Sequence, residues 1–230
     1  MITLILFASV SVFGVSVFGM DASSCRKLVA SSIGDTPSET AVFFANADAA
    51  YRDCRAESLP ADVRAQAASN YGTAKAIRNN LQAAVAAYKE ALNVLSPVET
   101  AYSDLTLDVL DRVVRAESQA GLRSDAIDHA SRALDIRRTK FGADSPQAVA
   151  AMVQLAMVHT TFESYSAAEA ILNNAYRAAQ KRCGEQCQTL ADVYSGFSAL
   201  YAAQGNEAAE RKYDQLGLNA TPGPMRRRKD

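Results

Sequence analysis

The sequence contains no tryptophan, little glycine and proline, and almost no net charge. Its 11 glycines and 6 prolines are too few for a β-sandwich that is rich in turns. Its 24 Lys and Arg residues are balanced by 25 Asp and Glu residues, whereas a protein that binds nucleic acid needs clustered excess positive charge. The composition therefore excludes nucleic acid as the main partner. Hydrophobic residues make up 49% of the chain, which is enough to bury a core.

The residues needed for common catalytic sites are also scarce. The two histidines, His129 and His159, both fall in stretches with a helical pattern. The sequence has no glycine-rich phosphate loop and no His-Glu-x-x-His motif, and no pair of carboxylates stands out from ordinary helix-surface charge. We expect His159 to pack in the core and His129 to lie on the surface. We predict a protein that is not an enzyme and that has no metal and no cofactor.

The first 20 residues, Met1 to Met20, form an apolar run without a charged side chain. Asp21 and several small residues follow the run, as in the apolar core and cleavage region of a secretory signal peptide. We predict that residues 1–22 direct export to the periplasm or to the extracellular space. A run of this length also fits an uncleaved membrane anchor or a buried helix. Lipidation at Cys25 is a further alternative, although the Leu that normally stands three residues ahead is missing.

The four cysteines all lie beyond the apolar run. Four cysteines allow three connectivities, and proximity in the sequence favours the pairs Cys25–Cys54 and Cys183–Cys187. Disulfides agree with export, because exported chains fold in an oxidising compartment. A zinc site at the second pair is the alternative, but it would need both histidines as further ligands.

A repeat with a period of 42 residues runs through the chain. Alanines recur at this interval, as Ala84, Ala126 and Ala168 and again as Ala91, Ala133 and Ala175. Apolar residues at three-to-four spacing predict two helices in each unit. The first helices span 63–78, 105–120 and 147–162, and the second helices span 81–94, 124–136 and 166–179. Such hairpins stack into a solenoid, because one hairpin cannot bury its apolar stripe alone.

These residues resemble the tetratricopeptide repeat, a helical hairpin with a small residue at position 8, Gly near position 15 and Ala at positions 20 and 27. If Leu107 opens one unit, Gly121, Ala126 and Ala133 fall at positions 15, 20 and 27. The longer period is similar to that of the kinesin-light-chain variant. Val114 at position 8 and Glu163 at position 15 depart from the pattern. The resemblance implies an all-α fold, a right-handed α-α superhelix whose last unit fits after a one-residue deletion in its turn.

The patterns divide the chain into four parts. The expected parts are a signal peptide or signal-anchor over 1–22, an N-terminal capping region over 23–62, the repeat domain over 63–218, and a disordered basic tail over 219–230. In the capping region, a helix from about Ser38 to Ala56 is expected to be tied by Cys54 to the segment around Cys25. Any contact with a membrane is expected only through the leader or the basic tail.

The resemblance also implies a binding groove, because the first helix of each tetratricopeptide unit lines the concave face. Carried over to this sequence, the groove residues are Gln66, Ser69, Thr73, Asp108, Asp111, Arg115, Gln119, Val153, Met157, Thr160, Asp192 and Ser195. We expect this groove to bind a protein or peptide partner, in an adaptor or scaffold of the cell envelope or extracellular space. The alternative is a non-catalytic ligand-binding or regulatory subunit of an envelope enzyme complex.

Overall fold

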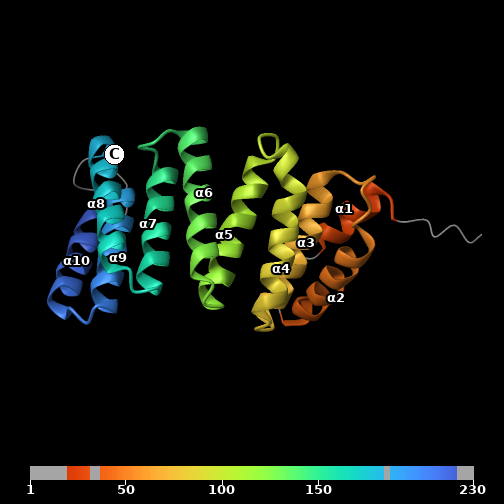
Figure 1. Ribbon diagram of the computed structural model, residues 1–230, viewed down its shortest axis with the longest axis horizontal. Coiled ribbons are helices and arrows are strands. Elements are labelled where there is room, and N and C mark those ends of the chain that lie inside the picture. Colours follow the sequence, from red (N-terminus) through yellow and green to blue (C-terminus); the bar gives the residue numbers. More distant parts are fainter. Residues whose placement is uncertain (1–19, 32–36, 184–186, 222–230) are drawn as a thin grey trace, which may run out of the picture.

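The protein is a single row of antiparallel helices (Figure 1). The computed structural model describes residues 20–31, 37–183 and 187–221, so most of the leader and the basic residues 222–230 lie outside the described residues. Over these ranges the chain forms ten α-helices and no strand. They are α1 (Ala22–Ala30), α2 (Pro37–Asp53), α3 (Ala61–Ile77), α4 (Leu81–Leu95), α5 (Ser103–Gln119), α6 (Arg123–Phe141), α7 (Pro146–Thr161), α8 (Tyr165–Arg182), α9 (Gln188–Ala203) and α10 (Glu207–Ala220), with a short 3₁₀ helix, η1 (Ser96–Val98), after α4.

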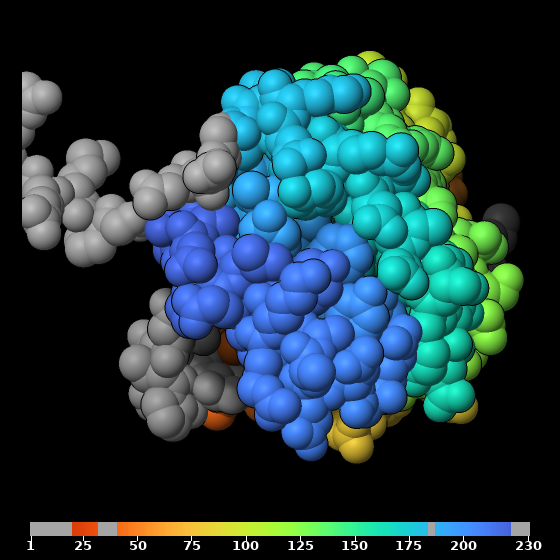
Figure 2. Space-filling model, turned by 90° about the vertical axis from the view of Figure 1, so that its left-hand side faces the viewer, coloured from red at the N-terminus to blue at the C-terminus, as the bar shows by residue number. Residues whose placement is uncertain are grey.

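Helices α3 to α10 form four consecutive hairpins, and each hairpin packs on the next through α4 with α5, α6 with α7, and α8 with α9. The predicted all-α solenoid is therefore confirmed. Viewed along the row from its C-terminal side, α9 and α10 form the end of the stack (Figure 2). Within the ranges that the structure describes, none of the helices combines the length and hydropathy needed to span a bilayer.

The turn inside each hairpin has the same backbone conformation. Asn79, Gly121, Glu163 and Gly205 follow one another at intervals of 42 residues, and each has φ between 58° and 76°. In each turn the amide of the residue after the left-handed one donates a hydrogen bond to the carbonyl five residues earlier, as the amide of Leu122 does to the carbonyl of Glu117. This is the Schellman motif, which satisfies carbonyls at a helix end and favours Gly at the left-handed residue. Because Gly205 lies 42 residues after Glu163, the one-residue deletion expected in the last turn is absent.

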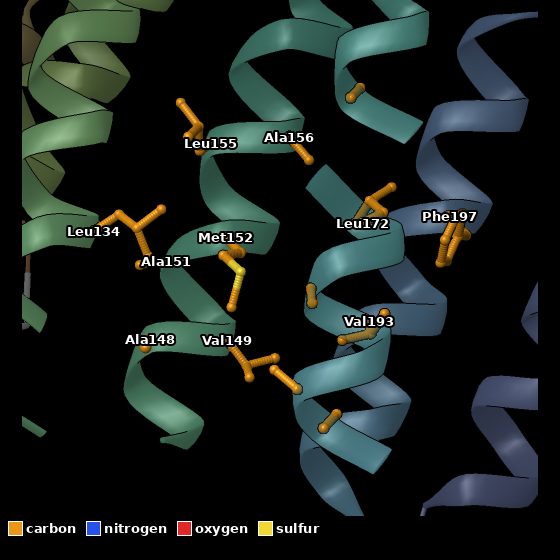
Figure 3. Close-up of a cluster of buried hydrophobic side chains, with 14 of the residues drawn as sticks. Leu134, Ala148, Val149, Ala151, Met152, Leu155, Ala156, Leu172, Val193 and Phe197 are labelled. Carbon is orange, nitrogen blue, oxygen red and sulfur yellow. The ribbon is translucent and has the colours of Figure 1, made fainter. Parts of the chain in front are cut away.

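The alanines of the repeat are the close contacts of the core. The six that recur at 42-residue intervals are at most 3% exposed. Figure 3 shows how α7 uses its two sides, with Ala151 and Leu155 facing Leu134 of α6, and Val149 and Ala156 directed toward α8. Small side chains let these helices approach closely, which explains why alanine makes up roughly a fifth of the sequence.

The N-terminal end differs from the single capping helix that the sequence predicts. Two helices are present instead of one. The additional helix, α1, precedes α2 and packs on both α2 and α3. The disulfide Cys25–Cys54 joins α1 to the residue after α2, and both cysteines are fully buried. Arg26 also bridges to Asp62 on α3, at 2.7 Å. The cap is therefore a shortened hairpin, in which α1 occupies the place of a first helix.

The second predicted disulfide, Cys183–Cys187, is also present and joins the end of α8 to the start of α9. The amide of Cys187 donates to the carbonyl of Ala220 at the end of α10, at 2.8 Å. This hydrogen bond holds the last two helices together at the end where the disulfide lies.

Candidate functional site

A recess opens between α5 and α7, the first helices of two successive hairpins. Its volume is about 420 Å³. The two helices approach one another at only a few points, whereas α7 and α9 pack along much of their length. On α9 the contact is made by Gly196, where a Cβ would lie 3.1 Å from Val153 Cγ1 on α7 and 2.7 Å from Leu172 Cδ2 on α8. The residue 42 positions earlier is Gln154, which is exposed and whose side chain lines the recess.

The recess, called the α5–α7 recess below, has an apolar floor and polar rims. Alanines 130 and 133 of α6 form part of the floor and are at most 4% exposed. Met157 is 42% exposed and gives the recess accessible apolar surface. The complete lining is Asp111, Val114, Arg115, Ser118, Gln119, Ala130, Ala133, Val153, Gln154, Met157, Val158 and Thr161.

Most charges around the recess are paired within the protein. Asp111 is held by Arg137 of α6, with 2.5 Å between Oδ2 and Nη2. Arg112 binds Asp108 at 2.9 Å and also donates to Thr73 on α3. Arg115, in contrast, is exposed and makes no ion pair or hydrogen bond with the described part of the chain. The recess therefore offers a ligand one free cation above an apolar floor.

The groove residues that were expected from the sequence lie in several separate places on the structure. Five of them share the α5–α7 recess, namely Asp111, Arg115, Gln119, Val153 and Met157. Gln66 lies in a different recess beside α1, and Asp192 and Ser195 lie in another between α9 and α10. Ser69 is fully buried and Thr160 is 8% exposed, so neither side chain is available to a ligand. Thr73 and Asp108 are taken up by the contacts of Arg112.

An ionic cluster around the buried Glu117 lies behind the recess, at the end of α5. Glu117 is fully buried and accepts a hydrogen bond from His129 Nδ1 of α6, at 2.8 Å. Lys89 of α4 lies 3.4 Å from the other carboxylate oxygen and 2.5 Å from Asp125. The hydrogen bond between Lys89 and Asp125 raises the pKa of Lys89 and lowers the pKa of Asp125. Because Glu117 adjoins Ser118 and Gln119, the cluster fixes this wall of the recess.

Both histidines are partly buried among side chains of the solenoid. His129 is not the surface residue expected from sequence, because its side chain is 20% exposed and binds Glu117. His159 is partly buried, and burial lowers its pKa, with a further contribution from Arg123 nearby. Among the described residues, no group of three or more His, Cys, Asp and Glu side chains could hold a metal ion.

Several residues of the recess, among them Ala130, Ala133 and Gln154, were missed by reasoning from sequence. Ala130 and Ala133 are on the second helix of their unit, whereas the expected groove residues are all on first helices. Gln154 was missed because the pattern gives no reason for α5 and α7 to stand apart. The sequence does show one difference between these units, because Gln154 holds the repeat position that Gly196 holds 42 residues later.

Comparison with known proteins agrees with the fold of stacked helical hairpins. Residues 105–181 match the family model of the tetratricopeptide repeat. The crystal structure of BtubC (BKLC) from P. vanneervenii superposes with a TM-score of 0.59 at 14% identity, over 91% of this chain and 92% of that chain. A putative kinesin light chain of Podosopora anserina with nearly identical TPR-like repeats gives a TM-score of 0.66 at 12% identity, over 86% of this chain and 91% of that chain. No curated protein matches the sequence.

Proposed function

We propose that this chain, in which residues 105–181 match the tetratricopeptide repeat, acts as a non-catalytic adaptor that binds a segment of another protein in the α5–α7 recess. The observation that carries the proposal is the combination of an apolar floor with one unpaired cation, Arg115, at the rim. A recess of about 420 Å³ is large enough for one bulky side chain together with part of its backbone.

The chemistry of the recess determines which segment fits. Val153, Val158 and the two floor alanines favour an apolar side chain as the anchor. Arg115 favours a carboxylate a few residues away from that anchor, because a guanidinium binds carboxylates with two parallel hydrogen bonds. Gln119 and Gln154 can bond to the backbone of an extended segment. The partner segment therefore carries a bulky apolar residue close to Asp or Glu.

The experiment is a selection of displayed random peptides against the wild-type protein and two variants, Arg115→Glu and Met157→Glu. The wild-type protein should enrich peptides with an apolar residue and a carboxylate within about three positions of one another. Arg115→Glu should no longer select the carboxylate, because like charges would then meet. Met157→Glu should lose most binding, because it places a charge on the apolar side of the recess.

The matched control is Asp128→Lys, which reverses a charge on the exposed surface of α6, outside the α5–α7 recess. It should bind the selected peptides as the wild type does. All variants should have wild-type melting temperatures, since the substituted side chains are exposed. Unchanged peptide affinity in both recess variants would move the binding site elsewhere on the solenoid.

Export to the periplasm or extracellular space is part of the same proposal. The apolar run before Met20 and the two disulfides support it, because both are features of exported chains. Mass spectrometry of the protein isolated from its natural source tests it in one measurement. A mature N-terminus near residue 20–23 and four oxidised cysteines are expected, whereas an intact leader would indicate a membrane anchor.

A further inference from the structure

The last hairpin exposes a face that the preceding hairpin buries. On α7 and α8 this face is covered by α9. Its residues Val149, Leu172, Ala175 and Ala179 are at most 1% exposed. The residues 42 positions later are Ala191, Asp214, Gly217 and Thr221, of which Asp214 and Thr221 are exposed. Next to them Leu218 is 71% exposed, the largest value among the exposed large hydrophobic residues of the described chain. The end of the solenoid therefore has an uncovered surface.

This surface contains a recess of about 480 Å³, called the terminal recess below. Part of its lining is apolar, from α9 and α10, and two carboxylates also line it. Asp192 accepts a hydrogen bond from Gln188, and Asp214 accepts one from Ser198, but no Lys or Arg of the described residues pairs with either. Ala191, Gly217 and Leu218 belong to the apolar part of this lining.

The residues that follow in the chain have the complementary chemistry. Thr221 lines the terminal recess, and the sequence then continues Pro-Gly-Pro-Met-Arg-Arg-Arg-Lys. Arg226 is five residues beyond Thr221, so an extended chain can carry it about 17 Å, which is more than the diameter of one helix, about 10–12 Å. We propose that residues 222–229 bind back over the terminal recess, with Met225 against Leu218 and the arginines paired with Asp192 and Asp214.

In this arrangement the basic segment has a role within the fold. A solenoid needs a polar cover at each end, because a terminal hairpin lacks the neighbour that buries its apolar face. At the N-terminal side a shortened hairpin and a disulfide supply that cover. At the other side the basic segment supplies it and neutralises two carboxylates. The α5–α7 recess is separate from this surface, so the inference does not depend on the proposed adaptor function.

Trypsin sensitivity tests the proposal on the full chain, because Arg226, Arg227, Arg228 and Lys229 are all cleavage sites. The variant is Asp192→Asn with Asp214→Asn, which removes both charges but keeps an oxygen that can accept from Ser198. The rate of cleavage at these four sites is followed by mass spectrometry at low salt. The variant should be cleaved about fivefold faster than the wild type, as expected from the loss of two exposed ion pairs. At 0.5 M NaCl the difference should disappear, because salt screens exposed charges.

The matched control is Asp128→Asn with Asp135→Asn, which removes two exposed charges from α6. It should be cleaved at the wild-type rate. Leu218→Ser tests the apolar part and should also accelerate cleavage. Equal rates for the wild type and the Asp192 and Asp214 variant at low salt would overturn the proposal. Protection that increases with protein concentration would also overturn it, because the occupant would then be the basic segment of a second copy.

Discussion

Gly72 on α3 lies directly against the ring of Tyr88 on α4. A Cβ at residue 72 would be 2.8 Å from Tyr88 Cε1 and 2.9 Å from Cδ1. The hydroxyl of Tyr88 is in turn hydrogen-bonded with Thr73, at 3.1 Å. The ring and the hydroxyl of Tyr88 both contact α3, and the small residue at position 8 of this repeat unit is explained by a contact with its own second helix.

Gly72→Ala should destabilise the protein by about 1–3 kcal/mol, because the added methyl group overpacks a side chain that cannot move away. Urea denaturation measures the change. The matched control is Gly217→Ala on α10, where an added Cβ would meet its nearest neighbour at 3.7 Å. That substitution should stabilise the protein by about 0.5–1 kcal/mol, through the higher helix propensity of alanine. A cost at residue 217 and none at residue 72 would contradict the packing described here.

Glu163→Gly should stabilise the protein, because Glu163 has φ 58° in a turn where two of the other three hairpins have glycine. Relief of the left-handed conformation is worth about 1–2 kcal/mol, and the entropy of an added glycine offsets part of it. The expected net gain in the free energy of unfolding is about 0.5–1 kcal/mol. Gly121→Ala is the converse variant and should cost a similar amount. A destabilised Glu163→Gly would mean that the glutamate side chain supports the turn.

His129→Ala should destabilise the protein by about 1–3 kcal/mol, because it leaves the buried Glu117 without its closest hydrogen-bond donor. Thermal and chemical unfolding both measure the loss. Asp125→Ala is the control, since Asp125 is 44% exposed and its ion pair with Lys89 should contribute less than about 1 kcal/mol. Equal effects of the two substitutions would argue against a special role of the buried carboxylate.

The stability of the protein should depend on the protonation of His159. Burial lowers the pKa of His159 from 6.5, so the unfolded chain binds the proton more tightly than the folded chain. The contribution of neutral His159 to the free energy of unfolding is therefore complete above about pH 6.5, and it is lost as the pH falls through the lowered pKa. Denaturation midpoints at pH 7.5 and 5.5 measure this effect. The wild type should lose more stability between these values than His159→Phe, and identical losses would assign the pH dependence to other groups.

The two disulfides should contribute unequally. Cys25 and Cys54 are separated by 29 residues, which predicts a loss of about 3–4 kcal/mol on removal, against about 2 kcal/mol for Cys183 and Cys187, separated by 4. The comparison uses Cys25→Ala with Cys54→Ala and Cys183→Ala with Cys187→Ala in urea denaturation. A larger loss from the second pair would show that the hydrogen bond between Cys187 and Ala220 depends on that disulfide.

Much of the fold could be predicted from the sequence because the 42-residue period is visible in single residues. Ala84, Ala126 and Ala168 are buried where the repeat places them, and both cysteine pairs join as proximity suggests. The short helix α1 was not predicted, because its nine residues give too few turns for a clear apolar period.

The candidate site was predicted less well. Arg115, Met157 and Val153 do share one recess. Ser69 and Ser195 hold the same repeat position in the first and last units, but Ser69 is buried and Ser195 is exposed. The difference arises because exposure depends on how closely the neighbouring first helices approach. The repeat pattern gives the same position to every unit and so cannot distinguish them.

The sequence by itself determined the hairpins of the repeat and the close-contact alanines, because these depend on local periodicity and on residues within one unit. Only the tertiary structure decided where the solenoid opens. Gly196 of α9 packs closely on α7 and α8, whereas Gln154, at the same repeat position of α7, lines an open recess beside α5. The pairing of Asp111 with Arg137, and the freedom of Arg115, likewise depend on which side chains from different helices meet. These contacts between side chains are set by packing between units, and the repeat pattern within one unit carries no information about that packing.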